Sequence, residues 1–309
     1  MGAYTLLLVL GQLLADFSFQ MKWIFLKNNE SRKHGIRGSL KQSGVQLGIY
    51  IVLTFIFFLI VNMQVDYVQI AIVIIIITCI HFFIDLAAKW LDELYNKKYS
   101  SEYMKSLMRL LIFLAVQIFH MATIILIIRI VTNTDMNFIK NLIALITLDE
   151  RLYLTQESMI ILSGIILLIN TYFSGFIISI ILQPFRPSNS YTESREEKKV
   201  TITKDNKIKN QVSSNESVQI ETQSIDAVIQ IQDSPKNAGI IIGIVERLII
   251  MVLVMVNAIG SIGFIIAMKA ITRFKQFEDK SFAEYYLIGS LISILFGIVS
   301  GYLMLSIWN

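Results

Sequence analysis

The chain has 309 residues, of which 55% are hydrophobic and only 16% are charged, and its mean hydropathy is +0.63. A soluble globular domain carries about 25% charged residues, so this composition excludes an ordinary soluble fold. The net charge of +4 is modest, and the lysines and arginines lie between the apolar runs, where they orient membrane proteins. We therefore expect the lipid bilayer as the main partner and no nucleic acid.

Seven apolar segments are long enough to cross the hydrocarbon core, which takes about 20 helical residues. The chain has only three prolines, which favours long, uninterrupted helices. The predicted fold class is all-α, a polytopic transmembrane helix bundle with six or seven spans. The single cysteine, Cys79, lies in one apolar run and is predicted to be a buried, unreactive residue. The predicted spans are 3–25, 44–61, 68–89, 107–130, 159–182, 238–268 and 285–306.

The loops between these spans differ in their basic residues. The loop after the first span and the loop after the third span are rich in lysine and arginine, whereas the turn 62–67 has neither. Basic loops face the cytoplasm in membrane proteins. This alternation predicts an N-terminus outside the cell and a multi-pass protein of the cell membrane.

Residues 183–237 form a polar insert without any apolar run. Two stretches in which apolar and polar residues alternate, 200–203 and 218–222, indicate short strands. The loop alternation places the insert in the cytoplasm, either as a flexible linker with hairpin character or as a docking site for a cytoplasmic protein. The chain is thus divided into an N-terminal membrane domain of five spans (1–182), the insert (183–237) and a C-terminal membrane segment (238–309).

The run 238–268 conflicts with the charge rule if it crosses the membrane once, because four basic residues that follow it would then lie outside. These residues are Lys269, Arg273, Lys275 and Lys280. The segment 257–263 contains Asn257 and two glycines, and a break there would convert the run into a re-entrant hairpin. The hairpin is favoured over a single crossing in which the glycines only permit close helix packing.

Ionisable and amide side chains lie inside the predicted spans, where a charge costs at least about 2.5–3.5 kcal/mol. Such residues need a partner, a cavity or a function. In the third span three polar residues lie one turn apart on one helix face, and the first span repeats this spacing. The two polar stripes can be buried only against each other or around a shared cavity. The predicted intramembrane cluster is Asp16, Gln20, His81, Asp85, Lys89, Gln117, His120, Glu246 and Arg247.

Imidazole and carboxylate groups four residues apart on one helix form half of a typical metal site, which a second helix can complete. The candidate ligands of a divalent metal are His81, Asp85, Asp16 and His120. In a structural interpretation, Asp85 instead pairs with Lys89 and the histidines donate hydrogen bonds between helices. A proton relay through the same residues is a third interpretation.

Glu246 and Arg247 are adjacent and therefore point away from each other on a helix, so each needs its own partner. One interpretation places both near the membrane interface, with Arg247 extending towards the headgroups. The other is a buried ion pair with Asp16 or Lys269.

Three motifs carry a resemblance to a known family. They are Gln12-Leu-Leu-Ala-Asp16-Phe-Ser-Phe-Gln20, His81-Phe-Phe-Ile-Asp85-Leu-Ala-Ala-Lys89 and Val116-Gln117-Ile-Phe-His120. The chain resembles the bacterial membrane family called domain of unknown function three-three-zero-seven, and the tail around Glu246 and Arg247 is similar to it as well. Its polar helices also look similar to those of bacterial membrane-bound metal-dependent hydrolases. The family's pattern has a histidine at the position of Gln12 and an aspartate at the position of Val116. This chain therefore lacks two potential ligands.

Three functions remain open for the chain. A membrane-embedded metal-dependent hydrolase would use the metal to activate water. A transporter or channel would use the polar stripes, Glu246 and the broken sixth run as an ion or proton path. A scaffold would hold a cytoplasmic partner at the insert. Because the ligand set is incomplete relative to the family's pattern, a non-enzymatic protein, transport-like or regulatory, is favoured.

Overall fold

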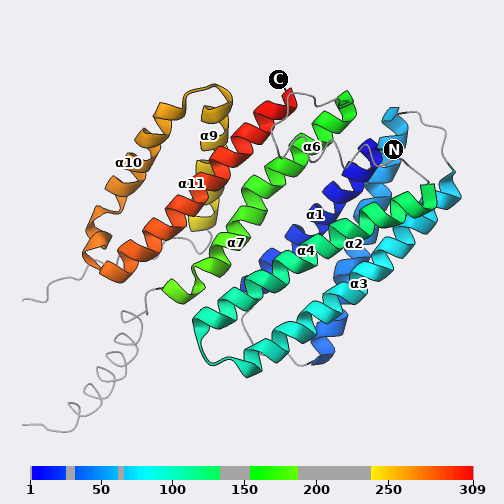
Figure 1. The fold of residues 1–309 in the computed structure, drawn as a ribbon, viewed down its shortest axis with the longest axis horizontal. Coiled ribbons are helices and arrows are strands. Elements are labelled where there is room, and N and C mark those ends of the chain that lie inside the picture. Colours follow the sequence, from blue (N-terminus) through cyan, green and yellow to red (C-terminus); the bar gives the residue numbers. More distant parts are fainter. Residues whose placement is uncertain (1, 26–31, 62–65, 133–153, 187–237, 309) are drawn as a thin grey trace, which may run out of the picture.

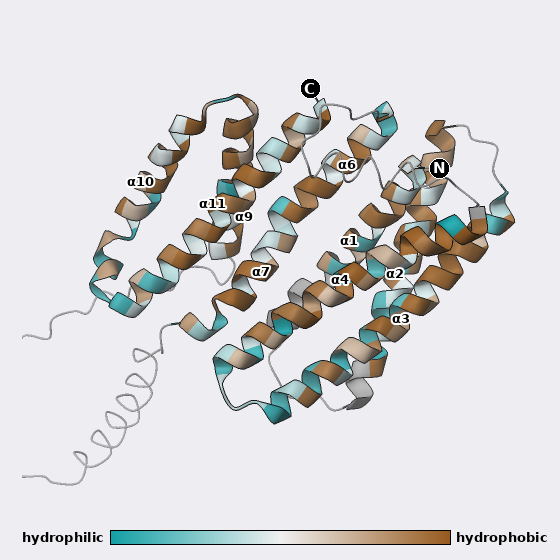
Figure 2. Ribbon diagram, viewed as in Figure 1, coloured by the Kyte–Doolittle hydropathy of each residue, from teal (hydrophilic) through white to brown (hydrophobic). Residues whose placement is uncertain are grey.

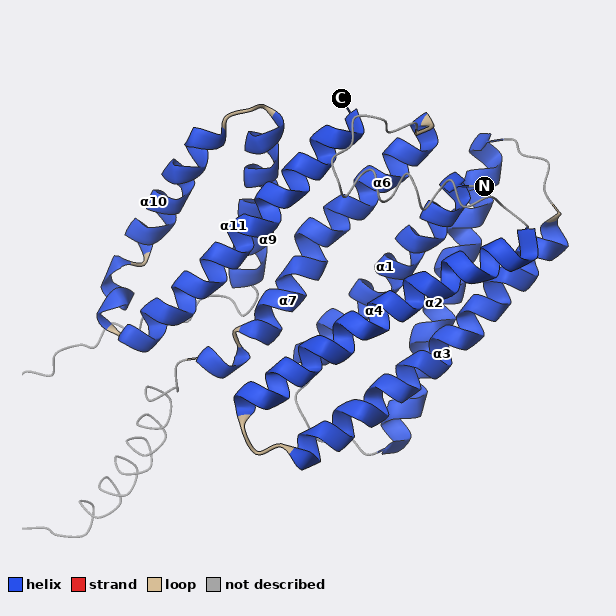
Figure 3. Ribbon diagram, viewed as in Figure 1, coloured by secondary structure: helices blue, strands red, loops and turns tan. Residues whose placement is uncertain are grey.

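The computed structural model describes the backbone of residues 2–25, 32–61, 66–132, 154–186 and 238–308, with all side chains there except those of 18–25, 32–35, 132 and 238. These ranges contain helices and short turns but no strand, which confirms the predicted all-α class for them (Figure 3). The elements are α1 (Gly2–Phe25), α2 (Arg32–Val61), α3 (Tyr67–Lys98), α4 (Glu102–Thr132), α6 (Gln156–Leu168), η1 (Ile169–Phe173), α7 (Ser174–Ile181), η2 (Gln183–Phe185), α9 (Ala238–Met255), η4 (Ile259–Ser261), α10 (Ile262–Thr272), η5 (Phe274–Glu278) and α11 (Lys280–Trp308).

Polar residues in the turns define where helices begin. The carboxylate of Asp66 accepts hydrogen bonds from the backbone N–H groups of Val68 and Gln69 and so caps α3. The hydroxyl of Thr155 accepts one from the N–H group of Ser158 at the start of α6. These caps satisfy N–H groups that the first helical turn leaves unpaired. The apolar runs then continue each helix to the next polar segment.

The bundle has the surface of a membrane protein. Five helices are long and apolar enough to cross a bilayer, and the described parts of α1 and α10 are shorter apolar helices. Figure 2 shows hydrophobic residues along the helices and hydrophilic ones concentrated near the helix ends. Large apolar side chains such as Ile60 and Phe264 are exposed on the outside. Hydrocarbon can solvate these side chains at no cost, so the predicted polytopic bundle is confirmed.

The run 238–268 forms a helical hairpin, as the favoured prediction states. The first arm, α9, ends at Met255, and after a short turn α10 runs back in the opposite direction (Figure 1). Asn257 lies in this turn with a φ of 56°, a left-handed conformation that asparagine tolerates better than most residues. Because α10 returns, Arg273 and Lys275 lie towards the end of the bundle where α9 begins. The conflict with the charge rule therefore disappears.

The central span of the bundle is the continuous helix made of α6, η1 and α7. Figure 1 shows α1–α4 on one side of it and α9–α11 on the other. Helix α1 packs against α2 and α6, and α9 packs closely against α11. The α9–α11 contact depends on Gly301, since a Cβ atom there would lie 2.6 Å from the Cβ atom of Val254.

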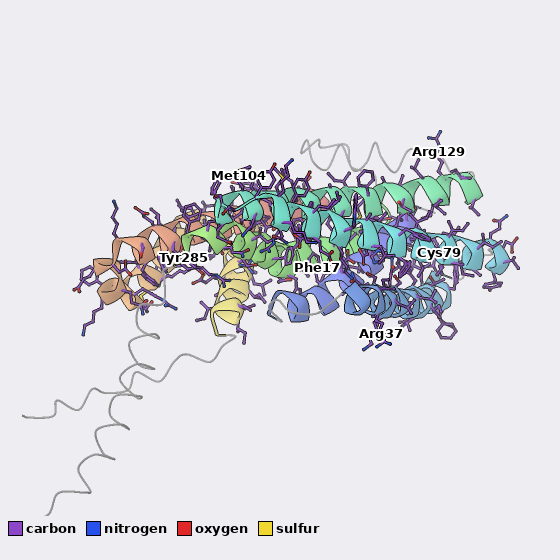
Figure 4. The ribbon with its side chains drawn as sticks, turned by 90° about the horizontal axis from the view of Figure 1, so that it is seen from below. Phe17, Arg37, Cys79, Met104, Arg129 and Tyr285 are labelled. Carbon is purple, nitrogen blue, oxygen red and sulfur yellow. The ribbon has the colours of Figure 1, made fainter. Side chains whose placement is uncertain are left out.

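The position of Cys79 differs from the prediction. Cys79 is exposed on α3 and points to the outside of the bundle (Figure 4), so the predicted burial is wrong. A small apolar thiol is as well solvated by hydrocarbon as by a protein core, so the apolar run alone could not show whether Cys79 faces lipid or protein.

Residues 187–237 lie outside the described ranges, and so do the predicted strands and docking site of the insert.

Candidate metal centre

The polar residues of the first, third and fourth spans come together between α1, α3 and α4. Asp16, His81 and His120 are each 1–2% exposed, and Asp85 and Gln117 are also buried. His81 and His120 lie in the central part of their helices. The cluster is therefore located between the ends of these helices and not at either end.

The four-residue spacing on α3 brings His81 and Asp85 to the same face of the helix, towards His120 of α4. The Nε2 atom of His81 lies 3.4 Å from Oδ2 of Asp85, and Nε2 of His120 lies 3.5 Å from Oδ1 of the same carboxylate. The two imidazole rings are stacked with their centroids 4.2 Å apart. One ligand atom from each of the three residues lies within 4.8 Å of the others.

Three side-chain atoms of this cluster are buried without a well-formed hydrogen bond to any residue that the structure describes. They are Nε2 of His81, Nε2 of His120 and Oδ2 of Asp85. A buried polar atom without a partner is costly and uncommon in native structures. All three atoms belong to side chains that bind transition metals, and they face one another.

Asp16 approaches the same point from α1, with its Oδ1 atom 3.9 Å from Nε2 of His81. Its Oδ2 atom accepts hydrogen bonds from the side-chain amides of Gln12 at 3.0 Å and Gln117 at 2.9 Å, and Gln42 donates to Oδ1 at 3.3 Å. These amides position the carboxylate without neutralising its charge. Asp16 therefore remains able to accept a cation.

Helix α2 adds polar side chains to the cluster that the sequence analysis missed. Gln46 donates from Nε2 to Oε1 of Gln12 at 2.5 Å, and the Tyr50 hydroxyl donates to the same oxygen at 3.0 Å. Both residues are fully buried. Gln42, Gln46 and Tyr50 are four residues apart, so the helical spacing that identified the other stripes was present here too. All three are uncharged, and for that reason they stand out less in an apolar run than an aspartate does.

Two further predicted residues belong to the turns beyond this centre. Lys89 lies one turn after Asp85, and its ammonium group donates to the Ser39 hydroxyl of α2 at 2.5 Å. The side chain of Gln20 lies outside the described residues.

Glu246 does not reach the cluster. Its carboxylate pairs with the ammonium group of Lys269 on α10, with Nζ and Oε2 2.5 Å apart, which is one of the pairings that the sequence analysis considered. The pair contributes to the wall of a cavity of about 350 Å³ between α9, α10 and α11. The ion pair thus joins the two arms of the hairpin.

Arg247 points in the other direction and is 3% exposed. Its Nε atom donates to the backbone carbonyl of Asn170 at 2.6 Å, and Nη2 donates to that of Thr171 at 2.8 Å. Both carbonyls belong to the π-helical turn η1, where the wider hydrogen-bonding pattern leaves backbone oxygens available to other donors. Arg247 therefore joins α9 to the central span and does not extend to the membrane surface.

The fold and this cluster define a class, a polytopic α-helical membrane protein with a buried centre of histidine, aspartate and amide side chains. Residues 4–148 match the model of the family described as protein of unknown function (DUF3307), so this part of the chain is similar to that family. The match includes most of α1 and all of α2–α4, the helices that supply the cluster. The tail that also resembled the family lies beyond the matched residues.

No curated protein and no solved structure matches the chain. The likeness to membrane-bound metal-dependent hydrolases therefore has no support from these comparisons.

Proposed function

We propose that the protein binds one divalent transition-metal ion, of the zinc type, in the middle of the membrane, and that its role is transport-like rather than enzymatic. The observation that carries the proposal is the convergence of three buried ligand atoms, from His81, Asp85 and His120, that have no well-formed hydrogen bond to any residue the structure describes. An ion between them would give all three a partner at once.

The distance from each histidine to the nearest Asp85 oxygen is close to the ligand spacing around a tetrahedral ion. Ligand atoms about 2.0–2.1 Å from a tetrahedral zinc lie about 3.3–3.4 Å from one another. The two nitrogen–oxygen distances at Asp85 are 3.4 and 3.5 Å. Two imidazoles and a carboxylate are a ligand set that suits zinc. Asp16 stands close enough to complete the shell directly or through a water molecule.

Charge supports the same conclusion. Two buried carboxylates, Asp16 and Asp85, place two negative charges in a region where each isolated charge is costly. A divalent cation neutralises both, while two neutral histidines contribute no charge. Neutralisation of the two carboxylates lowers the cost of burying them in hydrocarbon, and Lys89, one turn beyond Asp85, adds one positive charge nearby.

The position of the site favours transport over catalysis. Substrate sites of secondary transporters lie near the bilayer midplane, between helices that can rearrange. His81 and His120 lie in the central parts of two separate helices, α3 and α4, which is where such a site is expected. The hydrolase alternative needs a water-accessible path for a substrate, and no observation on the described residues favours one.

Metal analysis of the purified full-length chain tests the proposal. Wild-type protein, equilibrated with zinc in detergent and then desalted, should retain about one zinc ion per chain, and His81→Ala should retain none above background. His34→Ala is the matched control, because His34 lies in the first turn of α2 and is not among the candidate ligands, and this variant should bind as the wild type does. Absence of zinc from folded wild-type protein, or equal zinc in His81→Ala, contradicts the proposal.

Proton binding at the same residues is a second candidate, favoured by one contact. The Gln12 amide approaches the Nδ1 atom of His81 at 2.9 Å, and a donor there leaves the ring proton on Nε2, facing Asp85. Liposomes that contain the protein should then conduct protons without added metal, and Asp16→Asn should lose the flux. A wild-type flux equal to that of protein-free liposomes excludes this candidate.

A further inference from the structure

The side-chain amide of Gln12 is the most fully engaged group of the buried centre. Its Oε1 atom accepts from Gln46 and Tyr50, and its Nε2 atom donates to Oδ2 of Asp16 at 3.0 Å. The same Nε2 atom lies 2.9 Å from Nδ1 of His81. Gln12 is 1% exposed, so solvent does not compete for these bonds.

In the metal-free protein the Asp16 carboxylate fixes the direction of the amide, because an ionised carboxylate only accepts hydrogen bonds. Two donors converge on its oxygen, and a carboxylate and a ring nitrogen converge on its nitrogen. An amide nitrogen only donates, so the Nδ1 atom of His81 must accept. In a neutral imidazole the proton is then on Nε2. Nε2 faces Asp85 Oδ2 at 3.4 Å and Asp16 Oδ1 at 3.9 Å.

We propose that Gln12 is a positioning residue that sets the tautomer of His81, and that rotation of its amide by half a turn converts His81 from a ring with its Nε2 proton facing Asp85 into a metal ligand. The first half of this inference holds without any metal, and the second half rests on the proposed function.

The rotated state is chemically balanced. The proton leaves Nε2 of His81 and appears on Nδ1 of the same ring, where Oε1 of Gln12 accepts it, so the net charge of the ring is unchanged. The Nε2 lone pair is then free for a cation. Metal-bound histidines in proteins usually donate their other N–H group to an oxygen in this way.

The surroundings can follow this rotation. The hydroxyl of Tyr50 can donate or accept, and the amide of Gln46 can turn over as well, so both can meet the nitrogen of Gln12. Rotation turns the Gln12 oxygen towards Oδ2 of Asp16, which lies 3.0 Å from the amide nitrogen, so the Asp16 carboxylate must turn away from Gln12 and towards the bound cation. The Nδ1 atoms of His81 and His120, 3.2 Å apart, have room for only one proton between them. The rings must therefore move apart when both histidines bind metal through Nε2.

Nitrogen-15 magnetic resonance of histidine-labelled, full-length protein in detergent micelles reads the tautomer directly. The chain has only three histidines. Comparison of the wild-type spectrum with those of His34→Gln and His120→Gln assigns each signal to its histidine. In metal-free wild-type protein His81 should show a protonated Nε2 and an unprotonated Nδ1. After zinc is added, Nδ1 of His81 should be protonated and Nε2 should not.

Variants at Gln12 test whether the amide is the cause. In Gln12→Leu the preference of metal-free His81 for the Nε2 proton should be lost. In Gln12→Glu, which keeps the size and offers only acceptors when ionised, the proton should move to Nδ1. Gln117→Leu is the matched control, since Gln117 is another buried amide and its described hydrogen bond is to Asp16, and its spectrum should keep the wild-type tautomer.

The possible outcomes separate this inference from the proposed function. An Nδ1 proton in metal-free wild-type protein, or wild-type tautomers in both Gln12 variants, overturns the role of Gln12 even if zinc binds. The expected tautomers in a protein that binds no zinc support the role of Gln12 and overturn the metal proposal instead. Zinc binding without reversal of the two signals overturns the proposed amide rotation.

Discussion

Asp85→Asn is expected to abolish high-affinity zinc binding while leaving the helix bundle folded. Asp85 lies between the two histidines, 3.4 Å from one Nε2 atom and 3.5 Å from the other. Loss of an outer-shell partner typically weakens metal binding about 10–100-fold, and loss of a direct, charged ligand should weaken it more. An asparagine keeps the shape but presents an amide in place of a carboxylate. Zinc titration followed by calorimetry measures the loss.

Thermal unfolding gives an independent measure of the same effect. A ligand that binds only the folded state at about 100 times its dissociation constant adds about 2.7 kcal/mol to the free energy of unfolding. Wild-type protein should gain this stability with zinc, and Asp85→Asn should not. Asp92→Asn is the matched control, because Asp92 lies on the same helix but pairs with Arg109 near the helix end. Equal zinc stabilisation of wild type and Asp85→Asn would refute the assigned role.

Gly301→Val should destabilise the packing of α9 against α11. A Cβ atom at Gly301 would lie 2.6 Å from the Cβ atom of Val254 and 3.0 Å from the backbone oxygen of Met251. Neither atom is the end of a flexible side chain, so the helices themselves must move apart. Overpacking of a close contact typically costs about 1–3 kcal/mol, and we expect the upper part of that range. Unfolding by denaturing detergent, followed by circular dichroism, measures the change.

Gly48→Val provides the control for this substitution. A Cβ atom at Gly48 on α2 would meet nothing within 4 Å, so the same change in side chain adds only surface exposed to lipid. Its unfolding curve should match the wild type. Zinc binding should survive in folded Gly301→Val, because neither α9 nor α11 supplies a proposed ligand. Equal stability of the two valine variants would show that the close helix contact does not form.

Much of the fold could be predicted because hydrocarbon imposes strong constraints on sequence. A helix needs about 20 apolar residues to cross the bilayer, and each predicted span from 3–25 to 159–182 lies within a helix or within the continuous α6–α7 span, allowing one residue at its end. The hairpin at 238–268 could be predicted because four basic residues after it would otherwise lie on the wrong side. Asn257 and the nearby glycines marked the turn, and the structure places it there.

The candidate site was only partly visible in the sequence. Charged residues at helical spacing pointed to His81 and Asp85, since a charge in an apolar run is expensive enough to require an explanation. Gln46 and Tyr50 were missed because uncharged polar groups carry a smaller cost in hydrocarbon. Sequence spacing also could not separate Glu246 and Arg247 from the cluster, because it relates residues on one helix and not residues on different helices.

The sequence by itself determined that this protein is a membrane helix bundle, where its helices run, and which helix faces are polar. Only the tertiary structure decided that α1, α3 and α4 place their polar faces together with α2, that Arg247 holds the π-helical turn, and that Cys79 faces outward. The physical reason is that the apolar requirement acts on every residue in the bilayer, whether it faces lipid or protein. Composition therefore shows which segments span the bilayer. Which helices lie next to one another depends on hydrogen bonds and close contacts that form only when the helices pack.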